Sequence, residues 1–214
     1  MKLPIYLLIP AAIVLPVVAC SSTPPPPMSG GVAFKMQPPQ DAGSNSATGL
    51  ACQQRAAIYY VAQPQPSSTP DAPAYNEVVD GQNGAAVSCK FNGTSFSLRA
   101  NYNGNTFNAN GNYTVATADS AGNVTAGSAD NVTLSVVIGG TLYKEVSPPG
   151  CQFKIRKMTP VNVGGSFSGY FSCPQLVNQG GNPNDACAIN FNAGGDPTTI
   201  PANALFQFDN CQTL

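Results

Sequence analysis

Two neighbouring stretches of the chain decide its fold. They read Phe96-Ser97-Leu98-Arg99-Ala100-Asn101-Tyr102 and Phe107-Asn108-Ala109-Asn110-Gly111-Asn112-Tyr113-Thr114-Val115. Apolar residues occupy even positions in the first stretch and odd positions in the second, which is the period of a strand with one buried face. Asn103-Gly104 lies between the two, and both residue types tolerate the positive φ that a two-residue hairpin turn requires. The pair predicts an antiparallel β-hairpin.

Segments of the same kind follow further along the chain. They cover residues 131–138, 141–146, 152–158, 166–172, 188–192 and 204–208, and Gly139-Gly140 predicts a second tight turn. Residues 51–62 are predicted as the first element, a strand with a short helix as the alternative. Roughly nine short strands separated by turn signals predict an all-β fold, either an antiparallel β-sandwich or a partly open barrel. Residues 49–214 are numerous enough for one such domain.

The N-terminus has the features of an export signal. Lys2 is followed by an apolar stretch over residues 3–18, which ends in Leu15-Pro16-Val17-Val18-Ala19-Cys20 and is followed by Ser21-Ser22. This ending resembles the lipobox of bacterial lipoproteins. The resemblance covers residues 1–22 and implies cleavage before Cys20 and acylation of that cysteine, usually with three chains. Serine at position 21 is compatible with transfer to the outer membrane of a Gram-negative cell.

Two other interpretations of the N-terminus are a secreted protein with an ordinary cleaved signal and a retained transmembrane helix. The helix is disfavoured because only 17 residues run from Leu3 to Ala19 and Pro4, Pro10 and Pro16 interrupt them. The lipoprotein interpretation divides the chain into three parts. Residues 1–19 are a signal peptide that is removed, 20–48 are a lipidated cysteine with a Pro/Ser/Gly-rich tether, and 49–214 are a single β domain.

The chain has seven cysteines, and Cys20 as the lipid carrier accounts for the odd one. The remaining six are Cys52, Cys89, Cys151, Cys173, Cys187 and Cys211. An even set fits three disulfides in an oxidising compartment. Sequence alone leaves the pairing open, and proximity and strand ends favour Cys52–Cys89, Cys173–Cys187 and Cys151–Cys211. A zinc site is disfavoured because the chain has no histidine and no CxxC pair.

Composition disfavours a nucleic-acid partner and most catalytic mechanisms. Only 9% of residues are charged, and without Lys2 eight basic residues face ten acidic ones. The absence of histidine removes the commonest general base. No nucleophile elbow or phosphate-cradling loop is present. We therefore expect no enzymatic activity and no cofactor apart from acyl chains on Cys20.

A histidine-free hydrolase would need two convergent carboxylates. The candidates are Glu77, Asp80, Asp119, Asp130, Glu145, Asp185, Asp196 and Asp209. Most lie beside Gly, Asn or Pro, where aspartate usually makes a turn by accepting hydrogen bonds from nearby backbone.

Four basic residues cluster in the sequence, namely Lys144, Lys154, Arg156 and Lys157. Lys154 and Arg156 share a strand face opposite Phe153 and Ile155, so they could meet an anionic partner. The alternative is a solvated strand face whose charges block aggregation.

These features together predict a lipid-anchored protein of the bacterial cell envelope, at the outer membrane and facing the periplasm or the cell surface. Its β domain is expected to be a non-catalytic binding or structural module for a protein or glycan partner. The alternatives are an accessory component of an envelope assembly, secretion or adhesion complex, and the histidine-free hydrolase.

Overall fold

The computed structural model describes residues 24–39, 52, 58–65, 75–146, 150–160, 164–181, 186–189 and 204–214. These residues are mostly in β-strands, which form one large mixed sheet and one two-stranded sheet. The all-β prediction is therefore confirmed. Within the described ranges, no helix has the length and apolar character needed to cross a membrane.

Sixteen strands are present in the described part of the chain, more than the roughly nine predicted. In order they are β1 (Ser29–Lys35), β2 (Ile58–Val61), β3 (Gln63–Pro64), β4 (Tyr75–Asn76), β5 (Val78–Val79), β6 (Ala86–Phe91), β7 (Ser95–Tyr102), β8 (Asn105–Asn112), β9 (Thr114–Ala118), β10 (Val124–Ile138), β11 (Thr141–Glu145), β12 (Cys151–Thr159), β13 (Ser166–Asn178), β14 (Ala186–Ile189), β15 (Ala204–Asp209) and β16 (Gln212–Thr213). Several of the additional strands have only two residues, which is too short for a periodic signal.

Both predicted hairpin turns are confirmed. Asn103 and Gly104 have φ angles of 50° and 75° and connect β7 to β8. Gly139 and Gly140 have φ angles of 56° and 80° and connect β10 to β11. Positive φ at both central residues gives the turn a twist that matches the flanking strands.

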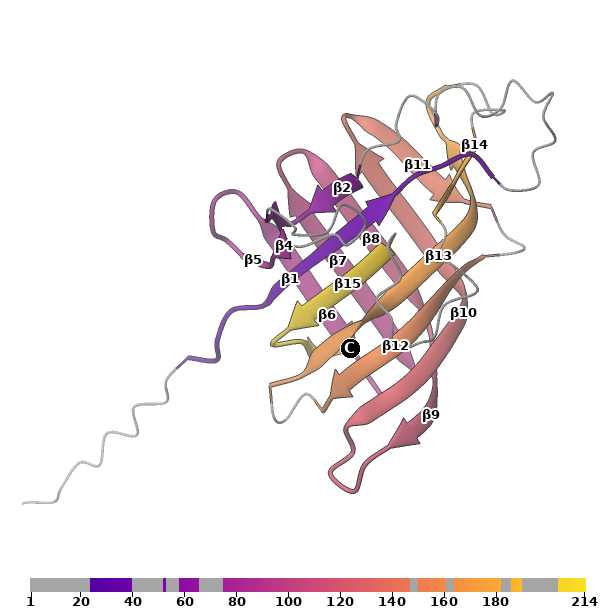
Figure 1. Ribbon diagram of the computed structural model, residues 1–214. Helices are drawn as coiled ribbons and strands as arrows, with labels where there is room; N and C mark the ends of the chain where they lie inside the picture. The colour runs from indigo at the N-terminus through magenta and orange to yellow at the C-terminus, as the bar shows by residue number, and fades with distance from the viewer. Residues whose placement is uncertain are drawn as a thin grey trace, which may run out of the picture.

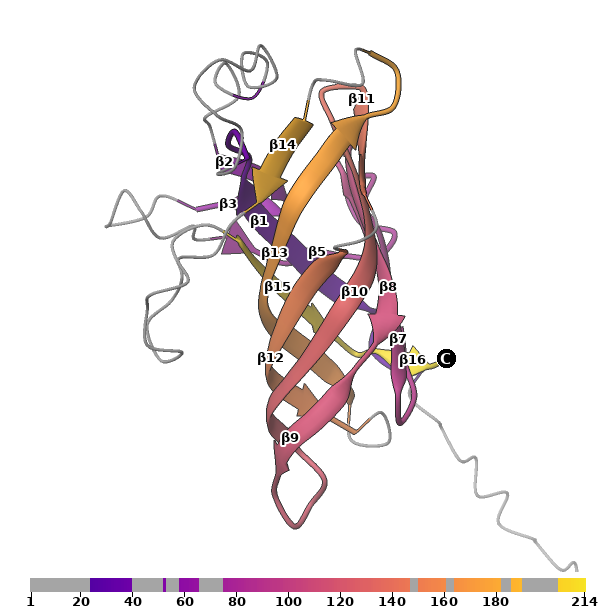
Figure 2. The ribbon, with the colours of Figure 1, turned by 90° about the vertical axis from the view of Figure 1, so that its right-hand side faces the viewer.

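The long strand β10 exchanges its neighbours halfway along. Its first half pairs with β9 and β12, and its second half pairs with β8 and β11 (Figure 2). The register against β12 shifts between Ala129 and Val132, which marks a bulge where the exchange takes place. Only residues 131–138 were predicted as a strand, because the first half of β10 has few large apolar residues to show a period of two.

Phenylalanine rings from distant strands fill the core. Phe96 on β7 packs against Phe153 on β12, with ring centroids 5.6 Å apart. Phe171 on β13 lies 5.5 Å from Phe107 on β8 and 6.1 Å from Phe34 on β1. The sheet is therefore curved, so that the inner faces of its two halves meet (Figures 1 and 2).

Strand β1 lies inside the segment that was predicted to be a tether. It pairs with β15 on one side and with β2 and β5 on the other, and its Val32 and Phe34 are fully buried. The prediction that all of residues 20–48 form a tether is therefore wrong. Its Gly30-Gly31 pair has the composition of a linker, yet a Cβ on Gly30 would lie 2.4 Å from the ring of Phe208. This glycine serves close packing rather than flexibility.

The six predicted cysteines do form three disulfides, but the predicted pairing is wrong. The bonds are Cys52–Cys187, Cys89–Cys211 and Cys151–Cys173. Cys151 and Cys173 face one another across the neighbouring strands β12 and β13, with Cα atoms 4.3 Å apart. The other two bonds link segments more than 120 residues apart, which proximity along the sequence could not reveal.

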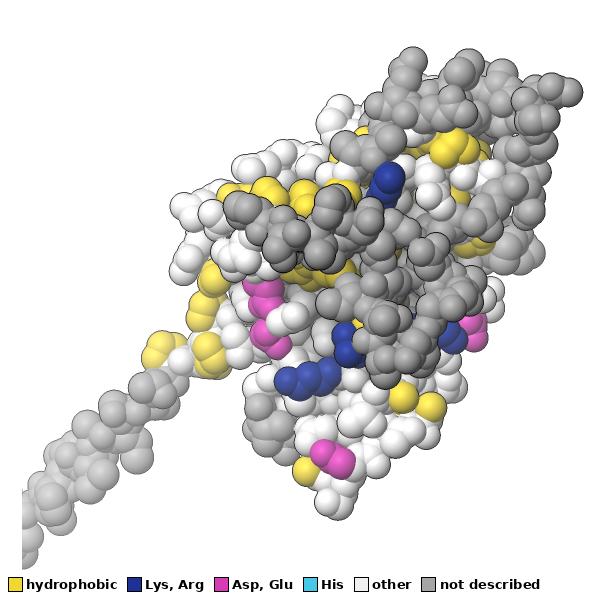
Figure 3. Space-filling model, viewed as in Figure 1, with side chains coloured by type: hydrophobic (Ala, Val, Ile, Leu, Met, Phe, Trp, Pro, Cys, Tyr) yellow, Lys and Arg dark blue, Asp and Glu magenta, His cyan; other side chains and the backbone are white. Residues whose placement is uncertain are grey.

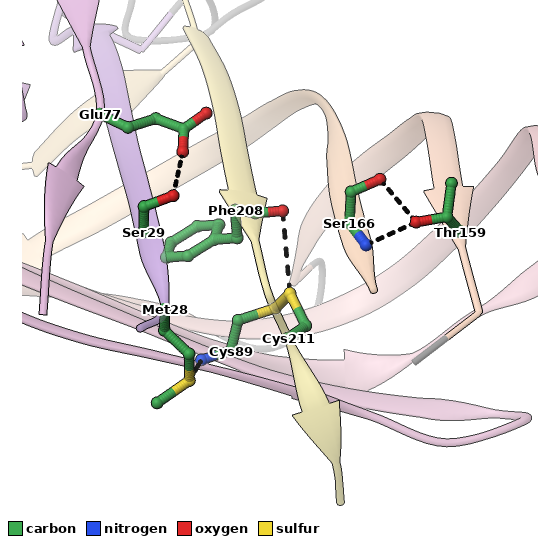
Figure 4. The surroundings of a disulfide bond; sticks show 8 residues. All are labelled: Met28, Ser29, Glu77, Cys89, Thr159, Ser166, Phe208 and Cys211. Atoms are coloured by element: carbon green, nitrogen blue, oxygen red, sulfur yellow. Dashed lines mark hydrogen bonds between the residues drawn. A yellow bond between two sulfur atoms is a disulfide. The ribbon is translucent and has the colours of Figure 1, made fainter. Parts of the chain in front are cut away.

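The Cys89–Cys211 disulfide lies beside Met28, the residue that precedes β1 (Figure 4). Cys89 belongs to β6, and Cys211 follows β15 directly. Beside them, the backbone N–H of Asp80 donates to the carbonyl oxygen of Met28 at 2.9 Å. The bond therefore links one end of the sheet to the strand that pairs with β1.

Candidate functional site

Three of the four predicted basic residues lie together on the outer surface of β12. Lys154, Arg156 and Lys157 are all exposed, and we call them the basic face. The register between β12 and β13 shifts between Ile155 and Lys157. This bulge explains why Arg156 and Lys157 are both exposed although they are adjacent in the chain. Lys and Arg side chains gather over the part of the molecule where β12 runs (Figure 3).

The in-register partners of Lys154 and Lys157 are polar and uncharged. Lys154 pairs in register with Ser128 on β10 and Tyr170 on β13, and Lys157 pairs with Ser168. The guanidinium carbon of Arg156 lies 5.4 Å from the centre of the Tyr170 ring, within cation–π range. Tyr170 is 6% exposed, and its hydroxyl has no hydrogen-bond partner among the described residues. The cross-strand neighbours thus hold the face in place without neutralising it.

Lys144 does not belong to the basic face. It pairs with Val177 of β13, whereas Lys154 pairs with Tyr170 of the same strand. Seven residues along a strand correspond to about 23 Å. The prediction of one four-residue face is therefore wrong, because residues close in the sequence lie at different heights of the sheet.

A groove lies on the outer surface of β7, β8 and β10. It has a volume of about 560 Å³ and is lined by Ser95, Phe96, Ser97, Asn110, Gly111, Asn112, Asp130, Asn131, Thr133 and Leu214. Ser97, Asn110 and Thr133 form one row across the three strands. Asp130 is the single charged residue of the lining, and Lys90 on β6 pairs with Ser97 beside it. The groove can therefore offer hydroxyl, amide and carboxylate groups with little net charge.

The β10 bulge shapes one wall of this groove. Asn131 has a φ of 56°, in the left-handed region that asparagine tolerates better than most residues. A Cβ on Gly150 would lie 2.8 Å from the Cα of Asn131, so the glycine lets the two backbones pack closely. Sequence reasoning missed the groove, because its lining is contributed by three strands and the chain terminus. The alternation in the sequence did place Asn110 and Asn112 opposite the apolar face.

Two of the predicted carboxylate candidates converge near the start of β1. The hydroxyl of Ser29 donates to Glu77 Oε2 at 2.6 Å, and Ser29 pairs in register with Asp209 (Figure 4 shows Ser29 and Glu77). Burial raises the pKa of Glu77, and the nearby Asp209 carboxyl raises it further, while hydrogen bonds from Ser29 and Gln207 oppose the shift. Neither carboxylate lines the groove described above.

Three other described carboxylates, those of Asp80, Asp119 and Glu145, have structural contacts, whereas Asp130 lines the groove. Asp119 accepts hydrogen bonds from the Asn123 side chain and from the N–H groups of Asn123 and Ala121, which lower its pKa. Asp80 accepts from the N–H of Val87, and Glu145 accepts from the N–H of Leu134. The turn interpretation is thus confirmed for Asp119. Asp185 and Asp196 lie outside the described residues, as does Cys20.

We expect the Glu77→Gln variant to be more stable than the wild type at pH 7. A raised pKa in the folded state means that the wild type loses stability as the pH rises from the ordinary value of about 4.5. Glutamine can keep the contact with Ser29 and carries no charge. Urea denaturation at pH 4 and pH 7 measures this, and the two proteins should differ less at pH 4. A variant that is less stable than wild type at both values would contradict the assignment.

The described part of the chain contains no group of three or more His, Cys, Asp or Glu side chains that could hold a metal ion. Comparison with known proteins gives no matching family model, no matching curated protein and no matching solved structure.

Proposed function

We propose that this chain is a lipid-anchored protein of the bacterial cell envelope whose β domain is a non-catalytic binding module for a glycan. Residues 1–19 are removed, Cys20 carries the acyl chains, and the domain faces the periplasm or the cell surface from the outer membrane. The lipobox-like ending at Cys20 and the pairing of the other six cysteines as disulfides support an exported, anchored protein.

We further propose that the domain is a partly open barrel rather than a sandwich. Pairing runs continuously through β6, β7, β8, β10, β12, β13, β15 and β1. The short strand β5 pairs with β1 and leads by a turn into β6, which brings the path back to its beginning. Cys89–Cys211 spans the same junction. A scaffold stabilised in this way can present an outer-surface site with fixed geometry.

The groove on β7, β8 and β10 is the observation that carries the glycan proposal. Its polar lining suits a ligand with many hydroxyl groups, because amides and carboxylates can bind neighbouring hydroxyls through paired hydrogen bonds. Asp130 is the single charged side chain of the lining, and its negative charge favours a neutral polysaccharide over a strongly anionic one. Leu214, which is 52% exposed, offers an apolar contact for the face of a sugar ring.

Calorimetric titration with neutral polysaccharide fractions and peptidoglycan fragments from the same cells tests this proposal. The double variant Asn110→Ala/Asp130→Ala should bind at least about tenfold more weakly, since it removes two polar contacts of about 1 kcal/mol or more each. Thr117→Ala/Thr125→Ala, on the exposed hairpin of β9 and β10, is the matched control and should bind normally. Equal affinity of the groove variant and the wild type, or no binding of any fraction, would contradict the proposal.

A second candidate is an accessory role in an envelope assembly, and strand β9 favours it. All five residues of β9 are exposed and uncharged, and in the described structure the strand pairs only with β10. An edge strand of this kind can accept a strand from a partner protein. Mild carboxylate-directed cross-linking of the native protein followed by mass spectrometry separates the candidates, because a stoichiometric protein partner cross-linked at Asp119, which directly follows β9, would favour the accessory role.

A further inference from the structure

We propose that the basic face of β12 docks on the anionic lipid headgroups of the same membrane that holds the Cys20 anchor. This inference rests on the proposed lipid anchor. It adds a defined orientation of the domain at the membrane, with Lys154, Arg156 and Lys157 directed towards the lipid.

The length of the stalk is the first argument. Because β1 begins at Ser29, only residues 20–28 separate the lipidated cysteine from the sheet. Nine residues can span at most about 30 Å even when fully extended. The tether predicted from the sequence had 29 residues and could have reached roughly three times as far. The actual stalk therefore keeps the domain close to the membrane surface.

The point where the stalk leaves the domain is fixed. Asn210 Nδ2 donates to the carbonyl oxygen of Pro27 at 2.9 Å, and the N–H of Asp80 donates to the carbonyl oxygen of Met28 at 2.9 Å. Ser29 then enters β1 with its hydroxyl bonded to Glu77. The described part of the N-terminal segment runs outward from this end of β1 (Figure 1). The free length of the stalk thus begins before Pro27.

The basic face lies within reach of that point. Register places Lys157 beside Ser168, Ser168 beside Gln207, and Gln207 beside Gly31. Gly31 is two residues from the start of β1. Three strand spacings amount to about 14 Å, which is within the roughly 23 Å that the seven free residues 20–26 can span. The stalk can therefore follow the curve of the sheet while the basic face rests on the lipid.

Electrostatic attraction to anionic headgroups favours the orientation in which the basic face lies on the lipid. Each lysine or arginine near an anionic membrane surface strengthens association by about fivefold. The mature chain has eight basic and ten acidic residues, so its surface as a whole is not attracted to such a membrane. The basic face differs from the rest of the surface, because it groups three cations and the in-register partners of Lys154 and Lys157 are uncharged. It can therefore be attracted to an anionic membrane. Because the stalk is short, the basic face has a high effective concentration near the lipid headgroups.

Amine labelling of the lipidated full-length mature protein tests the inference in vesicles. One set contains phosphatidylcholine alone, and the other contains phosphatidylcholine with one quarter phosphatidylglycerol. Brief acetylation followed by mass spectrometry reports each lysine separately. We expect Lys154 and Lys157 to react about fivefold more slowly in the anionic vesicles, and the protection to disappear in 0.5 M salt. Lys90 and Lys144, on other parts of the surface, should react equally in both sets.

Variants make the result specific. Arg156→Gln should reduce the protection of Lys154 and Lys157, whereas Lys144→Gln should leave it unchanged. Equal reactivity of Lys154 and Lys157 in the two vesicle sets overturns the inference, as does protection by a soluble anionic polysaccharide but not by anionic vesicles. Failure of the native protein to float with either set of vesicles would instead contradict the lipid anchor itself, so the two failures are distinguishable.

Discussion

Replacing Phe171 with alanine is expected to lower the free energy of unfolding by about 3–5 kcal/mol. Phe171 is fully buried, and its ring contacts rings from three other strands, those of Phe34, Phe107 and Phe153. Removing it leaves a cavity between the two halves of the sheet that the rigid strands can refill only in part. Urea denaturation of the disulfide-intact protein measures the loss.

The matched control for Phe171→Ala is Val115→Ala. Val115 is 45% exposed on β9, so its truncation should change stability by no more than about 0.5 kcal/mol. A loss below about 1 kcal/mol for Phe171→Ala would show that the ring does not join the two halves of the sheet.

The double variant Cys89→Ala/Cys211→Ala is expected to lose about 4 kcal/mol of stability. These two cysteines are 122 residues apart in sequence, but the Cys52–Cys187 bond provides a shorter circuit between them in the unfolded chain. That circuit contains about 60 residues, which sets the loop entropy that the bond removes. The variant also loses the covalent link beside the entry of β1, so β1 should exchange its amide hydrogens faster.

Cys151→Ala/Cys173→Ala is the control for this disulfide. Its loop spans 22 residues, so the same entropy argument gives a smaller loss of about 3 kcal/mol. Urea denaturation of both double variants measures which of them loses more stability. Hydrogen exchange measures whether the amides of β1 exchange faster in Cys89→Ala/Cys211→Ala. If removing Cys89–Cys211 had no effect on β1 while stability fell, the bond would not hold the junction that we describe.

The sequence predicted the parts of the fold that depend on local order. The β7–β8 hairpin could be recognised because alternation and the Asn103-Gly104 turn act over a few residues. Strand β1 could not, since its Gly30-Gly31 pair looks like a linker until Phe208 is placed against it. Two of the disulfides join segments that only the curved sheet brings together.

The candidate sites show the same limit. Alternation correctly put Lys154 and Arg156 on an exposed face, because both lie within one strand. Lys144 was wrongly grouped with them, since its distance depends on how β11 and β12 align against β13. Glu77 and Asp209 were both named as candidates, but their convergence depends on the pairing of β1 with β5 and β15. Contacts across strands, rather than residue types, decided the outcomes for Lys144 and for Glu77 with Asp209.

The measurement that most directly tests the lipid-anchored module is mass spectrometry of the N-terminal peptide of the protein purified from its own cells. The account predicts a peptide that begins at Cys20 and carries a thioether-linked diacylglyceryl group and an amide-linked acyl chain. A chain that retains residues 1–19, or that begins elsewhere with no acyl group on Cys20, would contradict the anchor and the membrane orientation that depends on it.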